Sequence, residues 1–254
     1  MNPEGNLVTE KAELENLYLK TYIDRLKPNT ITPGLELLEE MKEYLFQLRL
    51  QLCRERVSKD WTMADLDTVL KQLKNNKARD AHGHTYELFK YGGKYLRFSM
   101  LKLFNLVKKT QVYPQILQPA NITSLYQQKG SKADLNNDRG IFNVVKLRTI
   151  LDRLIYNEKY EIIESSMSCS NIGARKHRNI RDHLFVLNAI LHEASTDKNI
   201  KIDIEIFDIM KCFDKMWASE TSNDMYNAGL NDDMFVLVAH SNEACLVAMK
   251  TPWG

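Results

Sequence analysis

The stretch IKIDIEIFDIMKCFDKMW, residues 200–217, decides the predicted fold, because in it alternating isoleucines lead into two Phe-Asp pairs. The alternation has the period of two that is typical of a β-strand. Its parity places Asp208 on the same side as Ile204 and Ile206. A carboxylate that ends an apolar strand face meets a cation or faces water. Two interpretations of Asp208 stay open here: a metal ligand at a strand end, and a solvated aspartate just after the strand.

Size and composition are those of a folded protein with a substantial core. The chain has 254 residues, of which 44% are hydrophobic and 27% charged. No apolar run approaches the roughly 18 residues of a membrane-spanning helix, and residues 1–15 lack the order of a signal peptide. Neither the cysteines nor the histidines show the spacing of a disulfide framework or a zinc site. These features predict an intracellular protein with no membrane partner.

Charge is unevenly distributed along the chain, although its formal sum is only +2. Residues 129–181 carry a net charge of +5 and residues 182–254 a net charge of −7. A basic region suits phosphates, and an acidic region suits divalent cations. The asymmetry favours a protein that binds nucleic acid or nucleotides together with Mg²⁺, but solvated charged faces produce similar imbalances.

Apolar residues at spacings of three and four predict that most of the chain is helical. Helices are expected within residues 10–26, 35–56, 58–76, 94–110, 146–166, 180–195 and 214–229, with Ser58, Asp60 or Thr62 capping the third. Residues 120–145 hold two β-prone stretches around a polar, Gly- and Asn-rich connector. They predict a hairpin that carries Lys129 and Arg139. A further β-prone segment lies in residues 243–254.

In this order the segments resemble the reverse transcriptase domain of non-long-terminal-repeat retrotransposons and, more distantly, group II intron maturases. FDIMKCFD, residues 207–214, is similar to the first palm motif of that family. ITSLYQQKGSKADLNNDRGIF, residues 122–142, resembles its fingers hairpin, and NIGARKHRNIRDH, residues 171–183, resembles a basic loop. NNKARDAHGHTYELFK, residues 75–90, resembles the block before the fingers. Each match is weak alone, and the shared order of all four makes the resemblance specific over residues 61–254.

The resemblance implies an α+β protein with the right-hand polymerase fold: helix-rich fingers with a β-hairpin and the start of the palm. Residues 1–60 are then a helical N-terminal extension, residues 61–199 the fingers region and residues 200–254 a partial palm with the first catalytic motif. The second carboxylate motif of the family is expected after Gly254. The chain is therefore expected to be a fragment that does not polymerise DNA by itself.

The resemblance also implies a catalytic centre. Asp208 would be the catalytic residue and the ligand of two Mg²⁺ ions, and the backbone carbonyl of Ile209 would complete the coordination on the nucleotide side. Phe213 would pack where the 2′-hydroxyl of a ribonucleotide would lie. Asp214 is equally suited to cap the following helix.

Basic residues would bind the nucleotide and the template. Lys129 and Arg139 would hold the triphosphate from the two strands of the hairpin. Template phosphates would be contacted by Arg175, Lys176, Arg178 and Arg181. The implied partners are an RNA template, an RNA–DNA hybrid and deoxynucleoside triphosphates.

The sequence departs from the family pattern at several positions. Gly140 replaces the proline of an Arg-Pro-Ile block, which is expected to loosen a turn. Asn171 and Ala174 replace a glutamine and a phenylalanine in the basic loop. Two other interpretations therefore stay open. One is a non-catalytic nucleic-acid-binding remnant that keeps the basic surface, and the other is an unrelated soluble domain with chance motif matches.

Overall fold

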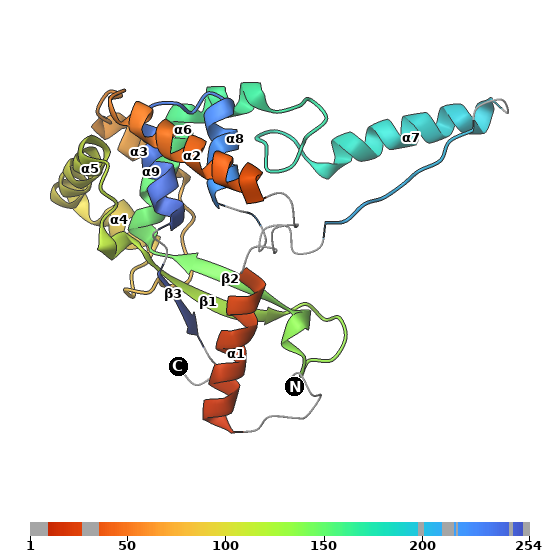
Figure 1. The fold of residues 1–254 in the computed structure, drawn as a ribbon, viewed down its shortest axis with the longest axis horizontal. Coiled ribbons are helices and arrows are strands. Elements are labelled where there is room, and N and C mark those ends of the chain that lie inside the picture. The colour runs from red at the N-terminus through yellow and green to blue at the C-terminus, as the bar shows by residue number, and fades with distance from the viewer. Residues whose placement is uncertain are drawn as a thin grey trace.

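A computed structural model describes residues 10–26, 36–197, 201–209, 216, 218–243 and 246–250. The predicted α+β class is confirmed, since helices are combined with a small mixed sheet (Figure 1). Most helices gather in one body, and the sheet lies beside it. One helix stands against the sheet, and another projects away from the body (Figure 1).

The helices and strands follow one another along the described residues with short connections. The helices are α1 (Lys11–Leu26), α2 (Glu36–Arg54), α3 (Met63–Gln72), α4 (Tyr86–Tyr91), α5 (Gly93–Thr110), α6 (Lys146–Ser166), α7 (Ile180–Thr196), α8 (Ala218–Asn227) and α9 (Asp233–Glu243). The strands are β1 (Pro119–Tyr126), β2 (Asp138–Val144) and β3 (Leu246–Lys250). The short 3₁₀ helices η1 (Gln115–Leu117) and η2 (Leu135–Asn137) precede β1 and β2. Every helix predicted from periodicity is confirmed.

The predicted hairpin is confirmed. β1 and β2 pair antiparallel, from Ala120 opposite Val144 to Tyr126 opposite Asp138. β3 pairs in parallel with the other edge of β1, which gives the strand order β2-β1-β3. The β-prone segment near the end of the chain is thus a strand that belongs to the sheet of the hairpin.

The strand predicted at the centre of residues 200–217 is wrong for the part that the structure describes. Residues 201–209 form neither helix nor strand. Ile206 is 91% exposed and Phe207 is 84% exposed. A strand needs a neighbour for its backbone hydrogen bonds and a surface that covers its apolar side chains, and alternation alone supplies neither. The expected start of a palm sheet is therefore not formed by these nine residues.

One hydrophobic core joins α2, α3, α5, α6 and α9. Its buried side chains include Phe46, Phe104, Leu154 and Phe235. The Phe235 ring packs edge-on against Phe46, with 6.1 Å between ring centroids, and against Tyr226, with 5.4 Å. These residues come from all three segments that the family resemblance separates. The three segments thus fold around a single core.

Local hydrogen bonds explain where α3 begins. The backbone N–H of Thr62 donates to Asp65 Oδ2 at 2.8 Å, and the backbone N–H of Asp65 donates to Thr62 Oγ1 at 3.4 Å. This reciprocal pair is a capping box, which satisfies two amides that have no partner within the helix. Among the three candidate caps, Thr62 is the one that caps the helix.

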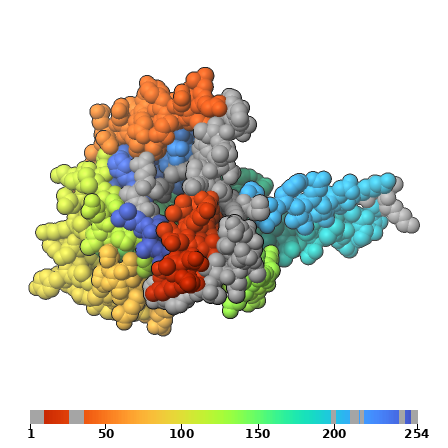
Figure 2. Space-filling model, turned by 60° about the horizontal axis from the view of Figure 1, so that its bottom comes forward, coloured from red at the N-terminus to blue at the C-terminus, as the bar shows by residue number. Residues whose placement is uncertain are grey.

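An arm stands out from the body (Figures 1 and 2). We define the arm as α7 and residues 201–209, which run back from the far end of α7 toward the body (Figure 1). No residue of α7, which the structure describes in full, is buried. The apolar face predicted on this helix, which includes Ile180 and Leu184, is therefore exposed. Among the described residues no helix has the length and hydropathy needed to cross a bilayer.

Candidate nucleic-acid interface

Helix α1 fixes the hairpin from one side. The buried guanidinium of Arg25 donates to the backbone carbonyls of Leu135 at 2.8 Å and Asp138 at 2.9 Å. The hydroxyl of Tyr22 donates to Ser124 Oγ at 3.1 Å. These contacts join α1 to both strands and to the turn between them. The first helix is therefore part of the hairpin's support.

Gly140 allows α1 to approach the sheet closely. A Cβ at this position would lie 2.6 Å from Cε1 of Tyr22 and 3.3 Å from Cγ2 of Ile122. Gly140 lies within β2, opposite Ser124. The expectation that this glycine loosens a turn is wrong, because the residue is in a strand. The missing side chain instead makes room for the Tyr22 ring.

The two residues predicted to bind triphosphate lie on the hairpin, and both are exposed. Arg139 is the second residue of β2 and pairs with Leu125 of β1. Lys129 lies in the connector between the strands. Successive residues of a strand point to opposite faces of the sheet. Because α1 packs against Gly140, its neighbour Arg139 lies on the face that α1 leaves uncovered.

Arg175 closes the basic loop that connects α6 to α7. Its Nε donates to Glu164 Oε1 at 3.0 Å, its Nη2 contacts the same oxygen, and its Nη1 donates to the carbonyls of Ser168 and Asn171 at 2.9 Å each. The Arg175 side chain is only 8% exposed. The hydrogen bond from Arg175 lowers the pKa of the Glu164 carboxyl. Arg175 thus stabilises the loop, and its contact with a template stays a prediction.

The other three residues of the predicted template-binding set are exposed. The Lys176 ammonium lies 3.9 Å from the ring centroid of Tyr160 and 5.5 Å from that of Tyr156, both on α6. Arg178 and Arg181 lie at the base of α7. Cations next to aromatic rings are the composition with which proteins bind phosphates and unpaired bases of single strands. The loop and α6 therefore form one candidate contact surface.

The predicted catalytic residues lie apart from the hairpin. Asp208 and Ile209 are exposed on the arm, and Phe213 lies outside the described residues. In Figures 1 and 2 the arm extends away from the body, so the structure does not bring Asp208 together with Arg139. No three His, Cys, Asp or Glu side chains in the described part of the chain gather as metal ligands. The Mg²⁺ site stays a prediction.

A cavity of about 520 Å³ opens beside the hairpin, at the strand face that carries Arg139. Lys74, Lys77, Lys146 and Arg153 line it, and no acidic residue is among the described residues of its lining. The sequence analysis missed this cluster, because its members come from the segment after α3 and from α6. The lysine pair at residues 74 and 77 was visible in the sequence, but no spacing indicates that it meets α6.

Asp152 carries the largest pKa change with a physical consequence that can be measured. Burial raises the pKa of this carboxyl from 3.8 to about 6, and the Arg148 guanidinium, whose Nε lies 3.7 Å from Asp152 Oδ2, opposes the rise. The folded state then binds the proton more tightly than the unfolded state. We therefore expect the free energy of unfolding to fall as the pH rises from about 4 to about 6. The effect is small, since 44% of the side chain is accessible to water.

Urea unfolding of the wild-type protein and of Asp152→Asn at several pH values checks this expectation. The variant should lose that part of the pH dependence. An Asp152 carboxyl carbon that titrates near pH 4 by NMR, at about its ordinary value, would contradict it.

Comparison with known proteins adds no further assignment. No protein-family model matches the chain, and no curated protein sequence is significantly similar to it. The resemblance to reverse transcriptases therefore stays an expectation that rests on four motifs. The hairpin, the basic loop and the cavity are the features from which a function is inferred below.

Proposed function

We propose that the chain is a partial reverse transcriptase domain of a retrotransposon, in which the β1–β2 hairpin and the basic loop bind an RNA template and a nucleotide. The observation that carries the proposal is the hairpin itself. The motif predicted it, it forms in the expected place, and Arg139 is exposed on its uncovered face. Charged donors from a hairpin are suited to a polyphosphate.

The proposal includes the finer features that the family resemblance implies. The fold is then the fingers and the start of the palm of a right-hand polymerase, and the partners are an RNA template, an RNA–DNA hybrid and deoxynucleoside triphosphates. Asp208 binds Mg²⁺, which neutralises the triphosphate charge. Lys129 and Arg139 bind the phosphates, and Phe213 contacts the sugar.

A second candidate is a non-catalytic module that binds nucleic acid. The position of Asp208 favours it, because this residue lies on the arm and not beside Arg139 (Figure 1). In this case the exposed cations of the loop and of the hairpin bind phosphates without any nucleotide chemistry. The two candidates differ in one measurable property, which is binding of a nucleotide that depends on Mg²⁺ and Asp208.

Titration with dGTP in the presence of Mg²⁺ separates them. If the chain is a polymerase domain, Arg139→Gln is expected to raise the Kd for dGTP about tenfold or more, since one charged hydrogen-bond donor is lost. Asp208→Asn should weaken dGTP binding only when Mg²⁺ is present. Lys109→Gln, which changes an exposed lysine in the last turn of α5, is the matched control. RNA binding without Mg²⁺-dependent dGTP binding would support the non-catalytic module.

A further inference from the structure

The cavity beside the hairpin has the size of a ligand site. It lies where the segment after α3, the strands β1 and β2, and α6 meet. Its volume of about 520 Å³ is within the range of about 300–1,000 Å³ that is common for ligand pockets. The sheet contributes apolar side chains to its wall, among them Leu125, Ile141 and Phe142. The cavity therefore offers an apolar surface as well as charge.

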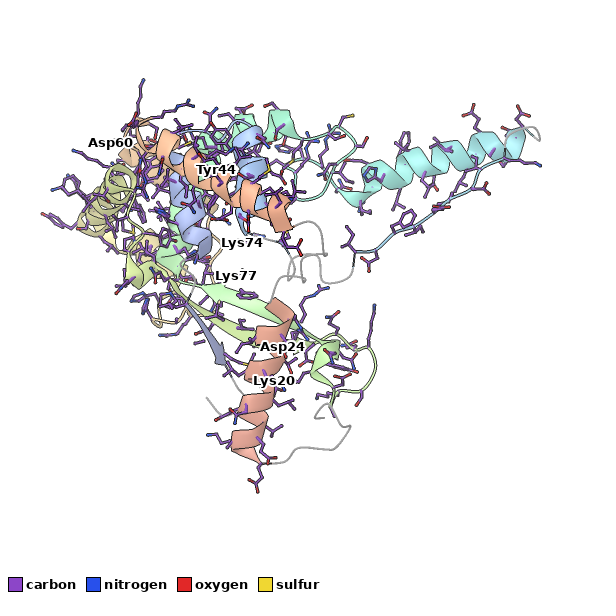
Figure 3. All side chains as sticks on the ribbon, viewed as in Figure 1. Lys20, Asp24, Tyr44, Asp60, Lys74 and Lys77 are labelled. Carbon is purple, nitrogen blue, oxygen red and sulfur yellow. The ribbon has the colours of Figure 1, made fainter. Side chains whose placement is uncertain are left out.

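Four cations surround this cavity. Lys74 and Lys77 are exposed and lie side by side where the helical body meets the sheet (Figure 3). Arg153 of α6 is half-buried, and Lys146 is buried at the start of the same helix. The described lining contains no carboxylate to compensate them. Like charges that face one cavity repel each other, so an anion that enters it is bound favourably.

The floor of the cavity is held rigidly. Lys146 Nζ donates to Asn143 Oδ1 at 2.7 Å and lies 4.9 Å from the ring centroid of Tyr86. Asn143 in turn donates from Nδ2 to the backbone carbonyl of Arg79 at 2.6 Å. These contacts fix a charge next to an aromatic ring. A second ring, that of Phe142, lines the cavity and is 43% exposed.

We infer that the cavity binds a short segment of single-stranded nucleic acid, with its phosphates at Lys74, Lys77 and Arg153 and an unpaired base against Tyr86 or Phe142. Aromatic surfaces with adjacent cations bind single strands in this way. The inference deepens the proposed function and rests on it for the ligand class. It assigns the strand to residues that the four sequence motifs did not predict to bind it.

A strand fits the surroundings better than a free nucleotide. The cavity wall includes Leu125, which pairs with Arg139, so the cationic surface continues along the sheet beyond the cavity. A strand contacts several phosphates along such a track. A free triphosphate is bound together with Mg²⁺ in proteins, usually through carboxylates, and the described lining of this cavity consists of cations, amides, hydroxyls and apolar groups.

Photocrosslinking of the full 254-residue chain tests the inference. A labelled single-stranded RNA that contains 4-thiouridine is crosslinked by long-wavelength light, and the modified peptides are identified by mass spectrometry. We expect adducts on Tyr86 or Phe142. We also expect the double variant Lys74→Gln/Lys77→Gln to bind this RNA at least about fivefold more weakly, since it loses two phosphate contacts. Lys109→Gln is the matched control and should bind like the wild type.

The outcomes separate this inference from the proposed function. RNA binding that is unchanged in the double variant, with adducts on other residues only, overturns the cavity site and leaves the proposed function standing. No detectable RNA binding overturns both. Displacement of the RNA by free dGTP at equal concentration would show that the ligand is a nucleotide and overturn the strand assignment. Both substituted lysines are exposed, so the thermal unfolding midpoint should stay unchanged.

Discussion

Asp80→Ala is expected to lower the free energy of unfolding by about 3 kcal/mol, because one buried carboxylate holds three backbone amides. Asp80 is 5% exposed. Its Oδ1 accepts from the backbone N–H groups of His82 at 3.0 Å and His84 at 2.8 Å, and its Oδ2 accepts from the N–H of Lys146 at 2.7 Å. Alanine leaves all three donors without this acceptor.

The three amides do not contribute equally. His82 and His84 are exposed, so water can replace the carboxylate at their amides. Lys146 is buried at the first position of α6, and its amide has no helical acceptor there. Most of the loss is therefore expected from the single bond between Asp80 and Lys146, since an unpaired buried donor costs about 1–3 kcal/mol.

Urea unfolding followed by tryptophan fluorescence measures the effect, and Asp80→Asn serves as the graded control. Asparagine keeps one acceptor oxygen and should lose about half as much stability as alanine. Equal stability of Asp80→Ala and the wild type would show that the connector does not depend on this carboxylate. Because Asp80 joins the segment of Lys77 to the start of α6, its loss should also deform the cavity.

Features that depend on neighbouring residues could be predicted from the sequence. Thr62 and Asp65 form the capping box of α3 within four residues, and the β1–β2 hairpin joins two strands that are close in the chain. The strand expected before Asp208 depends on a partner strand and on a covering surface, and the alternation of isoleucines contains information on neither. It was the strongest local pattern and the one that did not form a strand.

Features that join distant residues could not be predicted in this way. The contact between Tyr22 and Gly140 brings the first described helix onto β2, and from the sequence alone the glycine indicated only a flexible turn. Lys77 and Arg153 reach one cavity from different elements. Arg175 belonged to a basic loop in the sequence, and only the structure shows that Glu164 occupies it. Charge patterns predicted that anions bind this protein, and tertiary contacts decide which charges are free to bind them.

RNA binding is expected to weaken about 50-fold when the salt concentration rises from 50 to 200 mM. Each contact between a cation and a phosphate of a single strand contributes about −0.7 to the slope of log K against log salt. Lys74, Lys77, Arg153 and Arg139 provide four such contacts at the cavity and the hairpin. The slope is then about −2.8, and a fourfold rise in salt lowers the binding constant by that factor.

The length of the RNA and the double variant together show which cations contribute. A six-nucleotide RNA that occupies only the cavity and the hairpin should give the slope of about −2.8, and Lys74→Gln/Lys77→Gln should reduce it to about −1.4. A longer RNA that also reaches Lys176, Arg178 and Arg181 should give a steeper slope, by about −0.7 for each further contact. Fluorescence anisotropy at four salt concentrations measures these slopes. A slope near zero, or one that the double variant leaves unchanged, would mean that the RNA is not held by the phosphate contacts assigned to these residues.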